Sequence, residues 1–296
     1  MTEFVATLIA RPENAAALAE ATGRATAAVP VRATDTLAEA EAIDIYFTAE
    51  RPQSVERDAI AGAIADLPVD VVVQPLAHRR KKLLVADMDS TIIGQECIDE
   101  LADFAGLKAK VAAITERAMR GEIAFEPALR ERVALLAGLP VSTIDIVLAE
   151  RIRLTPGAKS LVATMRAHGA YTLLVSGGFT AFTEKVAAMA GFDETRANTL
   201  VVADGRLAGT VQEPILGRSA KLEALEESIV RRGIAAAETL AVGDGANDLA
   251  MIGRAGLGVA FHAKPTVAAA AAARIEHSDL TGLLYAQGYR VAEFRA

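Results

Sequence analysis

Residues 83–91 read Leu-Leu-Val-Ala-Asp-Met-Asp-Ser-Thr, a short apolar run that ends in acidic and hydroxyl side chains. Four consecutive apolar residues bounded by polar ones are typical of a strand in the interior of a parallel sheet. In open α/β folds, the polar groups that follow such strands collect at the carboxyl edge of the sheet, where ligands bind. The stretch therefore predicts an α/β fold whose chemistry begins at Asp87.

Two later strand candidates also end in polar loops, and a lysine lies between them in the sequence. The run 171–175 leads into Ser176-Gly177-Gly178, and the run 239–242 leads into Gly243-Asp244-Gly245-Ala246-Asn247-Asp248. Lys221 lies near the start of a helical pattern that reaches about residue 231, and residues 257–261 are a last candidate core strand. Because parallel strands end at one edge of their sheet, we expect these polar residues to gather around Asp87.

The residues before this region carry a different pattern. Strand-like runs cover 4–10, 29–33, 43–48 and 69–73, and helical patterns extend to about residue 21 and over 54–65. This β-α-β-β-α-β order is typical of a small ferredoxin-like sandwich, in which Pro30 would confine the second strand to a sheet edge. The basic cluster at 78–82 marks a junction. We expect an α+β domain over 1–80 and a doubly wound, mostly parallel α/β domain over 81–296.

An insertion interrupts the α/β pattern soon after Asp87. Between about residues 94 and 153, amphipathic helical segments are separated by glycines, and no strand pattern stands out. The α/β pattern resumes with a helix that reaches residue 167, and later a hairpin is expected about Asp204-Gly205 and a helix through the alanine run 268–273. The inserted segment therefore predicts a helical cap over the site.

Composition restricts the classes of function. The 296 residues are 52% hydrophobic but only 4% aromatic, which favours helices packed on a mostly parallel sheet. A formal charge of -7 argues against a nucleic-acid partner. We also expect no membrane segment, because no apolar run approaches about 20 residues. The N-terminal residues lack an export signal and Cys97 has no cysteine partner, so we expect a cytoplasmic protein.

The acidic pairs indicate a site for a hard cation. Asp87 and Asp89 are one residue apart beyond a strand, and their mutual repulsion is best relieved by a cation. Asp244 and Asp248 add further carboxylates. Such an oxygen-rich site suits Mg²⁺, which keeps several waters and takes remaining ligands from a substrate phosphate. The sequence therefore predicts Mg²⁺ as the cofactor.

The same residues supply what transfer of a phosphoryl group needs. One carboxylate can attack phosphorus and form an acyl phosphate, while a second protonates the leaving alkoxide and later deprotonates water. The hydroxyl of Ser176, nearby backbone N–H groups and Lys221 can stabilise the phosphoryl charge. Each motif alone has an ordinary explanation as a loop, a turn or a solvated lysine. Their ordered occurrence after successive strands favours the catalytic interpretation.

These motifs resemble those of the haloacid dehalogenase-like phosphatase superfamily. The resemblance covers about residues 83–290 and rests on Asp87-x-Asp89-x-Thr91, Ser176, Lys221 and Gly243-Asp244-Gly245-x-Asn247-Asp248. It implies that Asp87 is the nucleophile, that Asp89 is the acid/base, and that both hold Mg²⁺ with Asp244, Asp89 through its backbone carbonyl. It also implies that Ser176, Gly177 and Lys221 hold phosphate, with Asn247 near the substrate and Asp248 supporting the metal or Lys221.

The cap resembles that of one family within this superfamily, the phosphoserine phosphatases. The stretch from Asp87 to Glu96, together with Met119, Phe125 and Arg132, carries the resemblance. It implies hydrolysis of O-phospho-L-serine, the last step of serine biosynthesis, with Glu96 on the ammonium, Arg132 on the carboxylate, and the two apolar residues excluding solvent. The alternative is that the two charged residues are exposed helix charges and the two apolar ones are cap core.

Other interpretations use the same residues differently. The protein could transfer the phosphoryl group from Asp87 to another alcohol instead of water, or it could hydrolyse another small phosphate ester. It could also be a regulator that senses a phosphorylated metabolite without turnover. The presence of Asp89 beside Asp87 argues against a regulator, which has little need of an acid/base. The N-terminal unit resembles ACT-type regulatory modules, which implies amino-acid binding or a homodimer through this domain, although a purely structural role fits as well.

Overall fold

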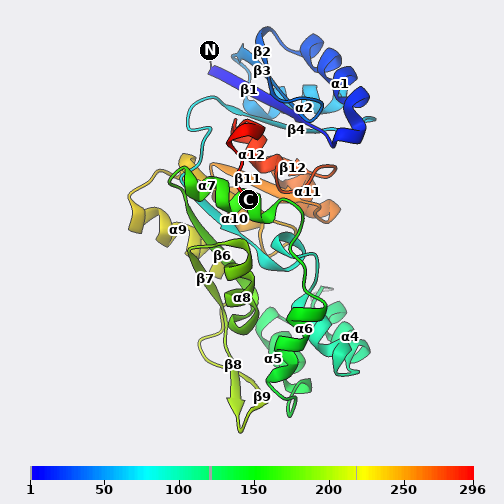
Figure 1. The fold of residues 1–296 in the computed structure, drawn as a ribbon, viewed down its shortest axis with the longest axis vertical. Coiled ribbons are helices and arrows are strands. Elements are labelled where there is room, and N and C mark those ends of the chain that lie inside the picture. Colours follow the sequence, from blue (N-terminus) through cyan, green and yellow to red (C-terminus); the bar gives the residue numbers. More distant parts are fainter. Residues whose placement is uncertain (1, 120–121, 218) are drawn as a thin grey trace.

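The computed structural model describes residues 2–119, 122–217 and 219–296, and the side chain of Met119 lies outside this description. Figure 1 shows an N-terminal α+β domain at one end, an α/β core in the middle, and a helical cap with a β-hairpin at the other end. None of the helices in the described ranges has the length and apolar character needed to span a bilayer.

The N-terminal domain has the β-α-β-β-α-β order predicted from its sequence. Its elements are β1 (Thr2–Ile9), α1 (Ala15–Ala28), β2 (Val31–Ala38), β3 (Ala42–Ala49), α2 (Gln53–Ala63) and β4 (Asp70–Pro75). The sheet order is β2-β3-β1-β4 with antiparallel pairing, so the strand beside Pro30 is at the edge, as expected. The first helix continues past Gly23, and the prediction that it ends near residue 21 was wrong, because one glycine weakens a helix without ending it.

A parallel sheet forms the core, as predicted. Its order is β12-β11-β10-β5-β6-β7, and every neighbouring pair is parallel. The strands are β5 (Leu83–Ala86), β6 (Tyr171–Phe179), β7 (Glu194–Asn198), β10 (Thr239–Gly243), β11 (Leu257–Phe261) and β12 (Ala273–Ile275). The central strand β5 is fully buried because side chains cover both of its faces.

Helices cover both faces of this sheet. Leu84 packs in one cluster with residues of α7 (Ala158–Ala167), α8 (Thr180–Ala190) and α12 (Gly282–Ala286). Leu83 packs in the opposite cluster with residues of α9 (Ala220–Arg232) and α10 (Leu249–Arg254). A further helix, α11 (Pro265–Ala270), leads into β12. The predicted helix through 268–273 was therefore wrong at its end, since Ala273 already begins a strand.

The helical insertion is present and joins the core through a narrow neck. It consists of α3 (Cys97–Phe104), α4 (Lys108–Met119), α5 (Phe125–Leu135) and α6 (Ser142–Glu150). The entering and leaving chains lie antiparallel, with a β-bridge between Ile93 and Leu154. The backbone N–H of Thr155 donates to the carbonyl of Ile92 at 2.9 Å. Both ends of the insertion are therefore held at one place on the core.

A β-hairpin that follows β7 in the chain is hydrogen-bonded to the cap. The predicted hairpin is formed by β8 (Leu200–Ala203) and β9 (Arg206–Val211), with Asp204 and Gly205 in its turn. Backbone hydrogen bonds join it to the cap, including Gly138 N–H to the Leu207 carbonyl at 2.8 Å and Leu207 N–H to the Leu139 carbonyl at 2.9 Å. Figure 1 shows this hairpin beside α5 at the far end of the molecule.

Two residues of the basic cluster at 78–82, Arg79 and Lys81, are buried, unlike the residues of a solvated linker. Arg79 is buried, and its guanidinium lies 2.6 Å from Oδ1 of the fully buried Asp44. It also donates to the hydroxyl of Thr7 at 2.9 Å and to the carbonyls of Tyr285 and Ala286. The planar guanidinium supplies several donors in fixed directions, which suits this buried position. Arg79 thus joins the N-terminal sheet to α12.

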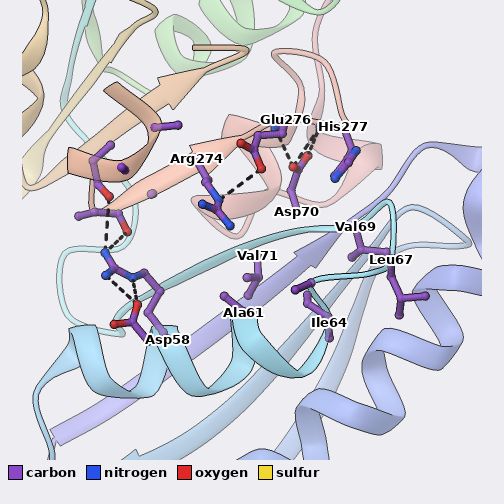
Figure 2. Close-up of a pocket in the computed structure, with 17 residues that line it drawn as sticks. Asp58, Ala61, Ile64, Leu67, Val69, Asp70, Val71, Arg274, Glu276 and His277 are labelled. Carbon is purple, nitrogen blue, oxygen red and sulfur yellow. Dashed lines mark hydrogen bonds and ion pairs between the residues drawn. The ribbon is translucent and has the colours of Figure 1, made fainter. Parts of the chain in front are cut away.

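Asp70 makes another contact between the two domains. Its carboxylate accepts hydrogen bonds from the backbone N–H groups of Glu276 and Ser278 at 2.7 and 2.8 Å, and from the Ser278 hydroxyl at 2.6 Å. Figure 2 shows Asp70 reaching across from β4 to the segment after β12, beside a groove that α2 borders on its other side. These donors replace hydrogen bonds that the buried carboxylate would otherwise make to water.

Candidate active site

The turn after β5 holds Asp87 at the carboxyl edge of the sheet. The backbone N–H of Asp87 donates to the carbonyl of Val242 on β10 at 3.0 Å, which ties the two strand ends together. Its carboxylate Oδ1 accepts a hydrogen bond from the N–H of Met88 at 2.7 Å. The following turn, Met88–Ile92, includes Ser90 with a positive φ of 54°. Asp87 is therefore nearly buried, but it still lines a cavity.

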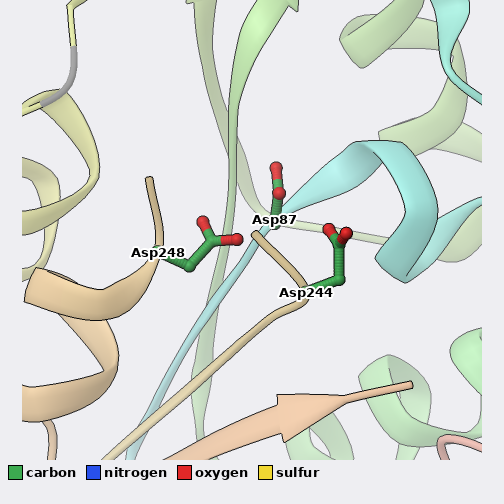
Figure 3. Close-up of side chains that lie close together, drawn as sticks. All are labelled: Asp87, Asp244 and Asp248. Carbon is green, nitrogen blue, oxygen red and sulfur yellow. The ribbon is translucent and has the colours of Figure 1, made fainter. Parts of the chain in front are cut away.

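Asp87, Asp244 and Asp248 form an acidic cluster. One carboxylate oxygen from each lies within 4.8 Å of the others, and Figure 3 shows Asp87 after β5 beside Asp244 and Asp248 from the loop after β10. Burial raises the pKa of Asp87, and the charge of Asp248 raises it further. Burial and Asp248 also raise the pKa of Asp244. Simultaneous ionisation of these buried carboxylates is unfavourable without a nearby positive charge. The cluster is therefore suited to a divalent cation.

Lys221 neutralises part of this negative charge. Its Nζ lies 2.6 Å from Oδ1 of Asp87 and 2.5 Å from Oδ1 of Asp248, and all three side chains are buried. Although burial disfavours the ammonium, the two carboxylates raise the pKa of Lys221 above its usual value. Asp248 packs tightly against Gly243, where a Cβ atom would lie 2.4 Å from Cγ of Asp248. The glycine is needed for this arrangement.

Asp89 lies apart from the acidic cluster. Its Oδ1 accepts a hydrogen bond from the backbone N–H of Cys97 at 2.8 Å, and its Oδ2 accepts one from the Ser176 hydroxyl at 3.0 Å. The same hydroxyl accepts from the N–H of Gly178 at 2.9 Å. Within the described ranges, the carboxylate cluster does not include Asp89. Its carboxylate is directed toward the phosphate-binding candidate Ser176.

A cavity of about 1080 Å³ separates these core residues from the cap. The core side is lined by acidic residues, a glycine, an amide and a lysine: Asp87, Asp89, Gly177, Lys221, Asp244 and Asn247. The cap side is lined by apolar and charged side chains, among them Glu96, Phe125, Leu129 and Arg132. Phe125 closes one side, because a Cβ atom on Gly177 would lie only 3.2 Å from Cζ of its ring. Cap and core thus meet at Gly177.

Glu96 and Arg132 place opposite charges on the cap side. Glu96 accepts a hydrogen bond from the Ser90 hydroxyl at 2.7 Å. Although its side chain faces open space, the cleft walls remove water from around it, and this desolvation, together with the charge of Asp89, raises the pKa of Glu96 to about 7. Arg132 donates to the Thr115 hydroxyl at 3.4 Å, and burial lowers its pKa. The cavity can therefore bind a molecule that carries both an anion and a cation.

The structure brings together the residues singled out in the sequence, apart from the side chain of Met119, which lies outside the described part. Asp99 and Lys264 also line the cavity but were not singled out. Asp99 lies in the first turn of α3, three residues after Glu96 at the N-cap, and this short spacing could have identified it. Lys264 follows β11 and donates its N–H to the Asp244 carbonyl at 3.4 Å. Its position just beyond a strand end was the available signal.

Cys97 lies beside the site but is not equipped to react. It is buried at the start of α3, and burial and the nearby Asp89 raise its pKa far above the usual thiol value. Since the thiolate is the reactive form, a raised pKa makes the thiol inert. Cys97 therefore has a packing role at the start of the cap.

Comparisons with known proteins agree with this geometry. The haloacid dehalogenase-like hydrolase family matches residues 84–253. A phosphoserine phosphatase of Polaromonas sp. is 48% identical over 223 residues, which cover 74% of this chain and 94% of that protein. One of Streptomyces coelicolor is 46% identical over 242 residues, 81% of this chain, and this chain spans only 59% of its length. The crystal structure of a family hydrolase from Salmonella enterica has a TM-score of 0.86 at 27% identity, and covers 96% of this chain and 98% of that one.

Proposed function

Because this chain belongs to the haloacid dehalogenase-like hydrolase family, we propose that it hydrolyses O-phospho-L-serine to L-serine and inorganic phosphate. One observation carries the proposal: a single cavity holds Asp87 on its core side and the charged pair Glu96 and Arg132 on its cap side. Phosphoserine has a phosphate at one end and an ammonium and a carboxylate at the other. The relatives named phosphoserine phosphatase support this choice of substrate.

The acidic cluster is our candidate for a Mg²⁺ site. The carboxylates of Asp87 and Asp244 and the backbone carbonyl of Asp89 would hold the ion, and Asp248 would support it from behind while it binds Lys221. Hard oxygen ligands of this kind suit Mg²⁺. When bound, the ion neutralises negative charge on the substrate phosphate. The raised pKa values of Asp87 and Asp244 fit a site that is completed by a cation.

The reaction follows from the two aspartates after β5. A carboxylate oxygen of Asp87 attacks phosphorus, the bond from phosphorus to the serine oxygen breaks, and Asp89 gives its proton to that oxygen. Asp89 then takes a proton from water, the water oxygen attacks phosphorus, and the bond to Asp87 breaks to release phosphate. Ser176 lies 3.0 Å from Asp89 and would hold a phosphoryl oxygen at that point.

Binding of the phosphate would use the polar groups of the core edge. The Ser176 hydroxyl, the N–H of Gly177 and the ammonium of Lys221 are donors for its oxygens, and Asn247 lines the same cavity. Lys221 is already held by Asp248, so it can contact the phosphoryl group without losing its orientation. Such preorganised donors stabilise the charge of the transition state more than that of the substrate.

The cap would select the substrate. Glu96 would bind the ammonium of phosphoserine, and Arg132 its carboxylate, for which the planar guanidinium offers two parallel donors. Phe125 would exclude water above Gly177. For Met119, whose side chain lies outside the described part, we propose the same role on the strength of the sequence resemblance alone. For the N-terminal domain we propose an ACT-type fold that stabilises the core and supports a homodimer, and for the whole protein a role in serine biosynthesis.

The test is release of phosphate from L-phosphoserine with Mg²⁺, beside a panel of other phosphate esters and the Asp87→Asn variant. Selective release that the substitution abolishes is the expected result. Unselective release would contradict the roles of Glu96 and Arg132. Added homoserine separates hydrolysis from transfer, because phosphohomoserine would appear if an alcohol replaced water. No release from any ester would instead favour a binding protein.

A further inference from the structure

Another cavity, of about 500 Å³, lies between the N-terminal domain and the core and is not used by the proposed reaction. Residues 9–13 and Glu41 form its N-terminal side. The core side is formed by residues from several loops, among them Ser90, Gly94, Pro156, Phe261, Asp279 and Tyr285. Small molecules commonly bind in cavities of this size at domain boundaries, where an apolar interior is combined with a few polar groups.

This cavity shares a wall with the catalytic cavity. Ser90 and Gly94 line the interdomain cavity, whereas Asp89 and Glu96, in the same short segment, line the catalytic one. The two sides are joined directly, because the Ser90 hydroxyl donates to Oε1 of Glu96 at 2.7 Å. The N–H of Ser90 also donates to the carbonyl of Gln95 at 3.2 Å. A molecule that displaces Ser90 would therefore disturb this hydrogen bond to Glu96.

The lining determines the kind of molecule that fits. Ile9, Phe261 and Tyr285 are buried and offer apolar surface. The acidic side chains in the lining are Glu13, Glu41 and Asp279, and they outnumber the single arginine, Arg11. This balance favours a positively charged ligand.

Glu41 is the best placed of these carboxylates. It is half-buried, and its Oε2 accepts a hydrogen bond from the Tyr285 hydroxyl at 3.2 Å. Among the described residues, its Oε1 has no hydrogen-bond partner and is available to a ligand. A charge-assisted bond from an ammonium to this oxygen would be stronger than a neutral one.

We propose that the interdomain cavity binds a small amphipathic amine, with its ammonium at Glu41 and its apolar part against Ile9 and Phe261, and that occupancy alters the position of Glu96. The second part rests on the proposed function, because it concerns the affinity for phosphoserine. A bound ligand changes that affinity only if it binds differently to the two positions of the shared segment.

Binding is tested by NMR of isoleucine δ1 methyl groups, with n-hexylamine at neutral pH as the probe. We expect a saturable shift of Ile9, which lines the interdomain cavity, at amine concentrations that leave Ile98 and Ile123 of the catalytic cavity in place or shift them less. Hexanoate, which has the opposite charge, should not shift Ile9. Glu41→Gln keeps an acceptor for Tyr285 and should weaken amine binding at least fivefold, whereas Glu39→Gln, an exposed residue in the same turn, should not.

Coupling is tested by the KM for phosphoserine with and without saturating n-hexylamine. We expect a change of at least twofold in the parent protein and in Glu39→Gln, and none in Glu41→Gln at the same amine concentration. A missing Ile9 shift would overturn the binding site, whatever the substrate is. An Ile9 shift without any change in KM would overturn the coupling. If the protein lacked phosphoserine phosphatase activity, the NMR result would still decide the binding site.

Discussion

The ammonium nitrogen of Lys221 lies 2.6 Å from Oδ1 of Asp87, the carboxylate that we propose attacks phosphorus. Both groups are buried, so their attraction is only weakly screened by water. The contact lowers the pKa of Asp87 and so opposes burial and Asp248, which both raise it and together leave it above its usual value. Lys221 thus prepares the nucleophile before it contacts any phosphate.

Replacing Lys221 with Met should lower kcat by about 10²–10³-fold, in the range found when one preorganised donor is removed from an active site. The pKa of Asp87 should rise further, and the acid side of the pH–rate profile should therefore move to higher pH. Steady-state phosphate release over pH 5–9 measures both effects. Lys221→Arg keeps the charge and should retain more activity and the parent profile. An unchanged profile in Lys221→Met would contradict this role.

Asp89→Asn should slow hydrolysis of phosphoserine by about 10²–10⁴-fold, because the proton donor for the leaving oxygen is lost. A nitrophenyl phosphate needs no such proton, since its leaving group is already stable as an anion. Rapid-quench kinetics should therefore show a fast first turnover with that ester and then an accumulating phosphoenzyme, because water is no longer activated. Equal loss of the first turnover with both esters would sink the acid/base role.

Glu96→Gln should raise the KM for phosphoserine by about 10–100-fold with a smaller effect on kcat, since a hydrogen bond to a charged group contributes about 1.5–3 kcal/mol. The pKa of about 7 means that Glu96 loses its charge as pH falls through neutrality. For the parent, kcat/KM should therefore fall below pH 7, and the variant should lack this component. Asp145→Asn, on an exposed position of α6, is the matched control.

Mg²⁺ should stabilise the protein more at pH 8 than at pH 5. The folded-state pKa values of Asp87, Asp244 and Glu96 are raised, so their protonated forms favour folding at low pH, and this contribution is lost as pH rises through those values. A cation restores stability only where the carboxylates are ionised. At 100 times its Kd, bound Mg²⁺ contributes about 2.7 kcal/mol. Calorimetric Tm values with Mg²⁺ and with EDTA at both pH values measure the difference.

Arg79→Met should destabilise the protein by about 3–5 kcal/mol, because the substitution leaves Asp44 charged, buried and without its partner. Arg290→Met is a matched control: it also removes a contact across the domain boundary, to Asp35, but that pair is exposed and should contribute about 0–1 kcal/mol. Urea unfolding followed by circular dichroism gives both values. Similar small losses in the two variants would show that Arg79 is not needed to hold the domains together.

The core of the site could be predicted because its residues follow buried strands of strong apolar pattern. Asp87 and Asp244 both come directly after such strands, and the parallel sheet places them together. The sequence did not reveal the direction of each side chain. Asp89 is only two residues from Asp87, yet the turn at Ser90, with its positive φ, leaves the Asp89 carboxylate hydrogen-bonded to Cys97 and Ser176.

Two strands at the sheet edges were missed for different reasons. The strand β7 reads Glu-Thr-Arg-Ala-Asn at a sheet edge, and its residues before the buried Asn198 are half-buried, so the apolar pattern of an interior strand is absent. The strand β12 begins at Ala273, where the alanine run still favours a helix by local propensity. Pairing with β11 decides its structure, and such a contact between distant segments is not visible in local sequence.

The neck at Ile93 and Leu154 has a consequence for how new specificities arise. Since the cap leaves and re-enters the core at adjacent points, a foreign cap of different length could be inserted there while Asp87, Asp244 and the parallel sheet keep their positions. The hairpin must be exchanged with it, because Leu207 is hydrogen-bonded to the cap backbone. Segments 94–153 and 200–211 would therefore be exchanged together, and recombination with the caps of distant relatives could change the substrate, provided that the incoming cap also supplies the backbone N–H that Cys97 donates to Asp89.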